Sequence, residues 1–255
     1  MRYKAIFIDI DDTILDYIPC CREAFNCALK ALNDEMSAQN TEQDTDRITQ
    51  DQLFELFFSI SGRLFAEAKH GLHTIAEVME LYPREFVREY RARTAFADRV
   101  QTEEQMTDTF KHAFRAGWGK THTLVPDARE TLEALHQKGY RLFAASNSFG
   151  HLQRSRLKYA GVLHLFEDTY ISMDIGYDKP DIRFYEEALR RCGLDAHDVL
   201  MVGDSMTTDI HGARMAGLDT CFFDRRNELT RERVNELTHE GLVVIHALPE
   251  LLSFL

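Results

Sequence analysis

The sequence predicts an α/β protein: a doubly wound parallel sheet with an all-helical domain inserted after its first strand. Two observations predict this class. Short apolar runs alternate with helical patterns in the second half of the chain, which is typical of a sheet covered by helices on both faces. The stretch 17–119 carries helical patterns without a strand pattern, and its length is typical of a small domain. We therefore expect an α/β core domain at 1–16 and 120–255 and a helical domain at 17–119.

The first predicted strand is Lys4–Ile10, because Ala5–Ile8 is a continuous apolar run that suits a strand buried on both faces. Later runs of the same kind predict strands at Arg141–Ala145, Thr169–Ser172, Val199–Val202, Thr220–Phe223 and Leu242–Ile245. A helix is predicted to open at Val125-Pro126-Asp127 and to end at Gly139. Further helical patterns cover Ile182–Arg191, Ile210–Ala216 and Glu228–Leu237.

Stripes of apolar and aromatic side chains recur at helical spacing in the inserted stretch. We expect them to form the core of a helical bundle rather than a ligand site. Pro83 lies between two of the stripes and predicts a break or kink at that point. The polar segment Asp34–Ile48 has no period and predicts a surface loop.

Composition and charge restrict the partners. The chain has 255 residues, of which 44% are hydrophobic and 28% charged, so it can bury a substantial core. Its 42 acidic and 30 basic residues give a net charge of −12. Such a surface repels phosphate backbones and anionic lipids, so we expect neither nucleic acid nor a membrane as a partner. No apolar run approaches the ~18 residues of a membrane-spanning helix.

The cysteines predict a reducing compartment. They are five in number and fit no zinc spacing, which favours free thiols. The first apolar run is interrupted at Asp9 and is too short for a signal peptide. We therefore expect a cytoplasmic protein, and a monomer and a homodimer both stay open.

Polar residues that can take part in catalysis or ligand binding follow the predicted strands, at the sheet edge where ligands of open α/β sheets bind. The first predicted strand ends within Asp9-Ile10-Asp11-Asp12-Thr13, and the second is followed by Ser146-Asn147. The strand at Val199 is followed by Gly203-Asp204, and Asp209 lies five residues beyond Asp204. Lys179 precedes a predicted helix. Carboxylates gathered in one crevice repel each other unless a divalent cation such as Mg²⁺ binds them. Lys179 suits a phosphate oxygen, and Thr13, Ser146 and Asn147 add hydroxyl and amide donors. This set of groups predicts phosphoryl transfer.

The same motifs resemble those of the haloacid dehalogenase-like superfamily of phosphohydrolases. The resemblance rests on four motifs in order, at Asp9-Ile10-Asp11-Asp12-Thr13, Ser146-Asn147, Lys179-Pro180-Asp181 and Gly203-Asp204 through Asp209. It covers residues 1–16 and roughly 122–225, and the inserted helices agree in place and type with the family's helical cap. The implied fold is a Rossmann-like core with that cap.

The resemblance implies a role for each motif residue. Asp9 would be the nucleophile that forms an aspartyl-phosphate, and Asp11 the general acid and then base. Mg²⁺ would be held by Asp9, the backbone carbonyl of Asp11, Asp204 and Asp209. The phosphoryl group would be bound by Thr13, Ser146, Asn147 and Lys179, and Lys179 would also neutralise Asp9. Asp12 is expected to be a turn residue only.

The chain departs from the family pattern at two positions. Ser148 stands where close relatives often have glycine, and Met173 where they often have glutamate, with Asp174 beside it. The second departure leaves open how the Lys179 loop is braced.

Within the superfamily the chain is most similar to the pyrimidine 5′-nucleotidase branch, through its large helical cap, the Asp-Asp-Thr of its first motif and the run Ile175–Pro180. This resemblance implies a Mg²⁺-dependent phosphatase for small phosphorylated metabolites, with nucleoside 5′-monophosphates as substrates. A sugar-phosphate phosphatase or a phosphoglucomutase-like phosphotransferase is the alternative. Asp11 argues against a 2-haloacid dehalogenase, whose branch lacks this residue, and the complete motifs argue against a non-catalytic binding module.

Overall fold

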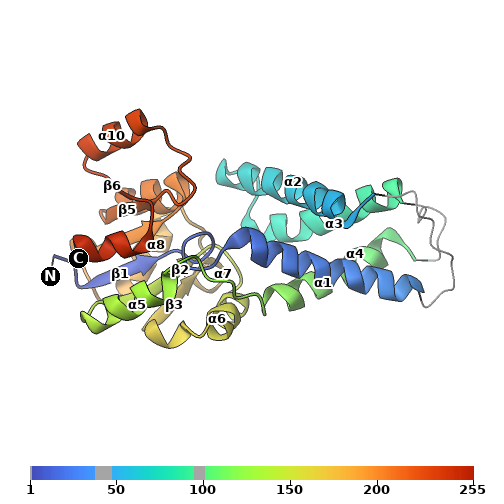
Figure 1. Cartoon of the computed structure of the whole chain (residues 1–255), viewed down its shortest axis with the longest axis horizontal. Coiled ribbons are helices and arrows are strands. Elements are labelled where there is room, and N and C mark those ends of the chain that lie inside the picture. Colours follow the sequence, from blue (N-terminus) through green and yellow to red (C-terminus); the bar gives the residue numbers. More distant parts are fainter. Residues whose placement is uncertain (1, 38–47, 95–100) are drawn as a thin grey trace. The chain divides into compact units, whose positions relative to one another are not determined.

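The computed structural model describes residues 2–37, 48–94 and 101–255, which form two compact units (Figure 1). The core unit comprises Met1–Tyr17 and His122–Leu255, and the helical unit comprises Ile18–Thr121. In the part of the chain that the structure describes, no helix combines the length and the apolar character needed to span a membrane.

The core unit is built on a six-stranded parallel sheet with the strand order β3-β2-β1-β4-β5-β6. The strands are β1 Ala5–Ile8, β2 Arg141–Ser146, β3 Asp168–Ile171, β4 Val199–Gly203, β5 Asp219–Phe223 and β6 Val243–Ile245. In the register of the sheet, Ile8 at the end of β1 lies beside Ala144 of β2 and Val202 of β4. The carboxyl ends of the three central strands therefore meet at one edge of the sheet.

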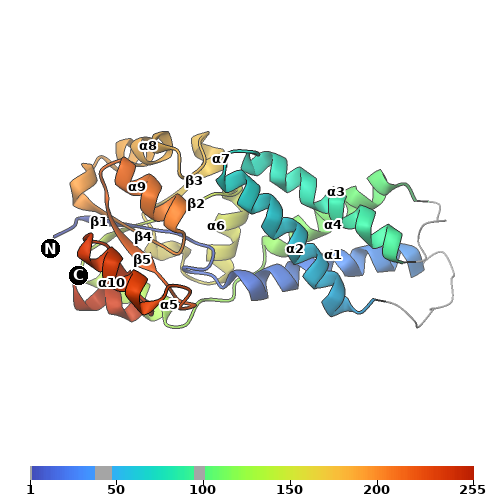
Figure 2. The same cartoon turned by 90° about the horizontal axis from the view of Figure 1, so that it is seen from above.

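Helices cover both faces of this sheet, which confirms the predicted doubly wound α/β class. The α-helices of the core unit are α5 Ala128–Gln137, α6 Gly150–Tyr159, α7 Ser172–Ile175, α8 Ile182–Cys192, α9 Gly212–Met215 and α10 Arg231–His239. Ile6 and Ile8 belong to one apolar layer, with residues of α5 and α6, whereas Ala5 and Phe7 belong to the other, with residues of α8 and α9. Figure 2 shows α8 and α9 on one side of the sheet and α5 on the other. Because successive side chains of a strand alternate between faces, a strand covered on both sides is apolar throughout.

Two predicted helices of the core unit begin later than expected. The helix expected to open at Val125 starts at Ala128, because Asp127 takes a left-handed conformation with φ 59°. The helix expected from Glu228 starts at Arg231, because the Asp224 carboxylate accepts the backbone N–H groups of Glu228 and Leu229 and holds them in a loop.

The helix expected at Ile210–Ala216 is two elements. A π-helical turn, η4, covers Met206–His211, and α9 follows it. Single π-turns of this kind are frequent at functional sites. Short 3₁₀ turns complete the unit as η2 Leu163–Leu165, η3 Ala196–Asp198 and η5 Leu248–Ser253.

The helical unit contains α2 Gln50–Lys69, α3 Ile75–Arg93, α4 Glu103–Trp118 and nearly all of α1 Tyr17–Ser37. Each of α2, α3 and α4 begins at a threonine whose hydroxyl accepts a backbone N–H, and whose own N–H is bound by a Gln or Glu three residues later. Phe25 of α1 packs its ring against Phe57, Phe86 and Phe110, with centroids 5.2–6.1 Å apart. These rings are buried, so the aromatic stripes are core, as expected.

Two expectations for the helical unit need correction. Pro83 was expected to break or kink the pattern; it lies inside α3, which is continuous from Ile75 to Arg93, so it does not break the helix. A proline inside a helix costs about 3 kcal/mol, and here the burial of its neighbours Tyr82 and Phe86 in the aromatic core offsets that cost. The loop was expected over Asp34–Ile48, but α1 includes the first part of this segment, up to Ser37. Residues 38–47 lie outside the described part of the chain.

Candidate active site

The strand register brings the predicted motif residues of the core unit to one edge of the sheet. Asp9 follows β1, and its N–H donates to the carbonyl of Val202 at 2.9 Å, so it is fixed next to the end of β4. Ser146 is the last residue of β2, and Asp204 directly follows β4. The side chains of this edge therefore come from segments nearly 200 positions apart in the sequence.

Three carboxylates meet there. Asp9, Asp204 and Asp209 each offer an oxygen within 4.8 Å of the other two. Asp9 and Asp209 are buried, with exposed fractions of 7% and 1%. Asp209 lies in the π-turn η4 and accepts the N–H of Ser205 at 3.0 Å. A Cβ on Gly203 would lie 2.7 Å from the Cβ of Asp209, so this close approach requires glycine.

A buried lysine neutralises part of this charge. The Lys179 ammonium donates to Asp9 Oδ1 and to Asp209 Oδ1, both at 2.6 Å, and to the carbonyl of Ala145 at 2.8 Å. All three donor positions of the ammonium are therefore used within the protein. Its exposed fraction is 4%.

The amide of Asn147 braces the Lys179 loop. It accepts the Lys179 N–H at 2.7 Å and donates to the Lys179 carbonyl at 2.8 Å. Asp174 accepts Arg154 Nη1 at 2.7 Å, and the N–H of Met173 donates to the carbonyl of Ser148. The two hydrogen bonds of Asn147 brace the Lys179 loop, which the departure at Met173 had left open.

The electrostatics leave the site with excess negative charge. Burial raises the pKa of the Asp9 carboxyl well above its ordinary value, and the carboxylates of Asp209 and Asp204 raise it further. Burial alone would lower the pKa of Lys179, but Asp209 and Asp9 outweigh it, so that the pKa of Lys179 is raised. One lysine thus faces three carboxylates, and a donor set made of carboxylate oxygens fits a hard divalent cation. The acidic residues at this edge can hold a metal ion.

Sequence reasoning missed two residues that hold Asp11. Arg156 Nη1 donates to Asp11 Oδ1 at 2.6 Å, and Gln153 Nε2 donates to Asp11 Oδ2 at 2.7 Å. Both donors are on α6 and are fully buried. Gln153 and Arg156 gave no clear signal in the sequence, because the face of α6 that packs on the sheet carries polar side chains and is recognised only by its burial.

The other predicted residues are close by but make different contacts. Ser146 Oγ accepts Gln153 Nε2 at 3.0 Å, and the fully buried Thr13 has its Oγ1 3.5 Å from Asp204 Oδ1. Asp12 has a φ of 61°, as befits the turn residue that was expected. Its carboxylate also pairs with two arginines of the loop after β5, Arg225 and Arg226.

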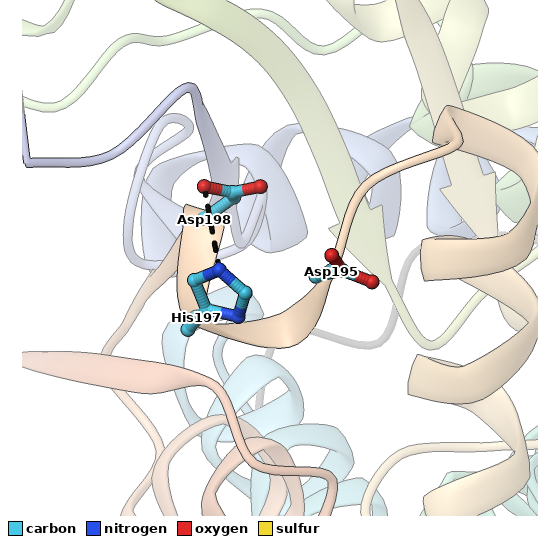
Figure 3. A group of neighbouring side chains, drawn as sticks. All are labelled: Asp195, His197 and Asp198. Atoms are coloured by element: carbon cyan, nitrogen blue, oxygen red, sulfur yellow. Dashed lines mark ion pairs between the residues drawn. The ribbon is translucent and has the colours of Figure 1, made fainter.

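A second group of metal-ligating residue types lies on the surface before β4 begins, and none of its members is a motif residue. It consists of Asp195, His197 and Asp198 (Figure 3). His197 Nε2 is 3.8 Å from Asp198 Oδ1, and Lys4 Nζ donates to Asp198 at 2.8 Å. Asp195 and His197 are exposed to solvent, whereas Asp9 and Asp209 are buried.

The fold and this edge of carboxylates agree with one family of hydrolases. Residues 3–217 match the family model of haloacid dehalogenase-like hydrolases, and the chain belongs to this family. HAD-hydrolase YfnB of Bacillus subtilis (strain 168) is 29% identical over 88% of this chain and 85% of its own length. The crystal structure of YfnB bound to magnesium matches with a TM-score of 0.74 and 26% identity, and covers 100% of this chain and 99% of its own.

Two further relatives have activities in their names. The glyceraldehyde 3-phosphate phosphatase of Methanothermobacter thermautotrophicus (strain ATCC 29096 / DSM 1053 / JCM 10044 / NBRC 100330 / Delta H) is 29% identical over 94% of this chain and 93% of its own length. Pyrimidine 5′-nucleotidase YjjG of Escherichia coli (strain K12) is 25% identical over 88% of this chain and 87% of its own length.

Proposed function

We propose that this chain is a Mg²⁺-dependent phosphatase of small phosphomonoesters. One observation carries the proposal: a fully buried lysine bridges Asp9 and Asp209, and Asp204 adds a third carboxylate at the same strand edge. A structural ion pair needs one carboxylate per ammonium, and the two excess carboxylates must be either protonated or bound by a further cation. The relatives named as phosphatases support the same reaction class.

The metal would be held by Asp9, Asp204 and Asp209, with the backbone carbonyl of Asp11 as a further ligand. Oxygen donors of this kind suit Mg²⁺, which binds one or two carboxylates together with water and phosphate. When bound, Mg²⁺ supplies positive charge next to the transferring phosphoryl group.

Asp9 is the proposed nucleophile. A carboxylate oxygen of Asp9 forms a bond to phosphorus while the bond from phosphorus to the leaving oxygen breaks. Lys179 favours the ionised form of Asp9 and holds it in place, since its ammonium is 2.6 Å from Asp9 Oδ1. The product of this half-reaction is an aspartyl-phosphate.

Asp11 is the proposed general acid and base. Its carboxyl gives a proton to the leaving oxygen in the first half-reaction and is left as a carboxylate. In the second, this carboxylate takes a proton from water as the water oxygen bonds to phosphorus and the bond to Asp9 breaks. Inorganic phosphate leaves, and both aspartates return to their starting states. A quarter of the Asp11 side chain is exposed, so it remains accessible to a substrate.

Phosphate binding is assigned to Lys179 and Ser146, with Thr13 beside them. The side-chain oxygen and nitrogen of Asn147 already bind the backbone of Lys179, so a contact of Asn147 with phosphate would come from its backbone N–H.

Nucleoside 5′-monophosphates, pyrimidine ones first, are the proposed substrates. The resemblance to the nucleotidase branch and the relative named as a pyrimidine 5′-nucleotidase support this class. Glyceraldehyde 3-phosphate is the second candidate, because the relative named for it aligns over 94% of this chain.

The test measures phosphate release from p-nitrophenyl phosphate, uridine 5′-monophosphate and glyceraldehyde 3-phosphate, with Mg²⁺ and with excess chelator. We expect activity with Mg²⁺ alone and none in Asp9→Asn. Asp195→Asn is the matched control, because it removes an exposed aspartate from the surface group and should leave activity unchanged. Activity in chelator, or in Asp9→Asn, would refute the proposed chemistry, and a higher kcat/KM for the sugar phosphate would refute the nucleotide preference.

A further inference from the structure

Arg156 is in an unusual place for an arginine. It lies on α6 beside Leu157, in the layer that packs on the sheet, and its side chain is fully buried. A guanidinium there loses its hydration, and a buried ion pair is often no more stable than apolar residues of similar volume. Stability alone therefore gives little reason for this residue, and its contacts indicate what it does.

Those contacts form a closed ring around Asp11. Arg156 Nη1 donates to Asp11 Oδ1 at 2.6 Å and also to Gln153 Oε1 at 2.7 Å. Gln153 Nε2 donates to Asp11 Oδ2 at 2.7 Å and to Ser146 Oγ at 3.0 Å. Each carboxylate oxygen of Asp11 thus has its own buried donor, and the two donors bind each other.

The ring fixes the plane of the Asp11 carboxyl group. A carboxylate held by one donor can rotate about its last torsion, whereas one held at both oxygens from the same helix cannot do so without breaking a bond. With one lone pair of each oxygen facing α6, a proton on Asp11 points away from the ring. The side chain keeps a quarter of its surface exposed, so that proton has an accessible direction.

We propose that Gln153 and Arg156 are positioning residues that aim the Asp11 carboxyl at the leaving oxygen of the substrate. This inference rests on the proposed function, because it needs Asp11 to act as the acid. Both residues are fully buried, and Arg156 reaches the reaction through Asp11. Gln153 also binds Ser146, and the loss of that contact would affect both kinds of leaving group alike. They matter most for leaving groups that cannot depart without a proton.

The experiment compares two kinds of leaving group. p-Nitrophenolate leaves as a stable anion, whereas an alkyl phosphate, such as uridine 5′-monophosphate or glyceraldehyde 3-phosphate, needs a proton on its leaving oxygen. kcat/KM reports the first half-reaction, in which Asp11 acts as acid. The alkyl phosphate used is the one of the two that the wild type hydrolyses faster. The readout is kcat/KM for p-nitrophenyl phosphate divided by kcat/KM for that alkyl phosphate.

Arg156→Met should lower kcat/KM for the alkyl phosphate by roughly 10²-fold, the loss expected from a displaced catalytic group, and leave that for p-nitrophenyl phosphate nearly unchanged. Arg156→Lys should recover part of the loss, because it restores a cationic donor. Gln153→Met keeps the arginine and should show the same selective loss to a smaller extent. Arg141→Met removes another arginine–carboxylate pair, that with Glu167, and should leave the ratio unchanged.

Equal losses for both phosphates in Arg156→Met and Gln153→Met would show a merely structural role and overturn the inference, as would no loss in either. If Arg156→Met does not fold, the ratio in Gln153→Met decides by the same criterion. Asp11→Asn separates the two proposals: if it shows no loss selective for the alkyl phosphate, the proposed acid is wrong. If it shows that loss and the ring variants do not, only the positioning inference fails.

Discussion

Removing the Lys179 ammonium gives the sharpest test of the candidate site. Lys179→Met keeps most of the side-chain volume and deletes the charge that is 2.6 Å from both Asp9 and Asp209. Lys4→Met is the matched control. Its ammonium is 2.8 Å from Asp198, but 64% of the Lys4 side chain is exposed, against 2% for Lys179.

Burial decides the expected difference between the two variants. Breaking a buried ion pair leaves an uncompensated buried charge and costs about 3–5 kcal/mol. An exposed ion pair contributes about 0–1 kcal/mol. In chelator, Lys179→Met should therefore lower the free energy of unfolding by several times as much as Lys4→Met. With Mg²⁺, Lys179→Met should abolish phosphate release, whereas Lys4→Met should not.

The pH dependence gives a second, independent signature. Burial already raises the pKa of the Asp9 carboxyl, and without the ammonium of Lys179 this carboxyl favours its protonated form still more strongly in the folded state. The destabilisation by Lys179→Met should then be small at about pH 5. It should be larger at about pH 8, because the free energy needed to keep a buried carboxyl protonated rises with pH. Urea unfolding in chelator at both pH values measures this. Similar losses in the two variants, or a loss independent of pH, would show that the ammonium does not neutralise buried carboxylates.

Three further predictions concern the same edge of the sheet. Asn147→Ala removes both hydrogen bonds to the Lys179 backbone and should lower the free energy of unfolding by about 1–3 kcal/mol, measured in urea, together with kcat; an unchanged kcat would contradict the bracing role. Gly203→Ala places a Cβ against Asp209, so Mg²⁺ should raise Tm less than in the wild type, which calorimetry measures. In metal-free wild type, the pKa of Asp9 is higher in the folded than in the unfolded state, so protonation of Asp9 stabilises the fold. The free energy of unfolding should therefore fall as the pH rises from the unfolded-state pKa of Asp9 to its folded-state pKa. Saturating Mg²⁺ should remove that fall, and a flat profile without metal would contradict it.

The sequence predicts the sheet and its edge because both leave local signals. A strand buried on both faces is a continuous apolar run, as at Ala5–Ile8, and the residue that follows it lies at the ligand-binding edge by the geometry of parallel sheets. Asp9, Ser146 and Asp204 could therefore be placed before the structure was known.

The ring around Asp11 left no comparable signal. Gln153 and Arg156 are polar residues on a helix and resemble any solvated face until the burial of α6 is known. The pairing of Asp12 with Arg225 joins positions 213 apart. Likewise Pro83 predicted a break or kink, and the break did not occur, because propensity is a local rule and the burial that overrides it is not local.

The central place of β1 has a consequence for synthesis of the chain. Ala5 pairs with Arg141 on one side and with Val199 on the other, so the first strand to leave the ribosome waits for most of the chain before both its edges are covered. The contacts of the helical unit, by contrast, lie within one continuous stretch, Ile18–Thr121, and can form in the meantime. Until β4 emerges, Ala5–Ile8 is an uncovered apolar strand, and a truncation before Val199 would leave one of its edges open to other chains.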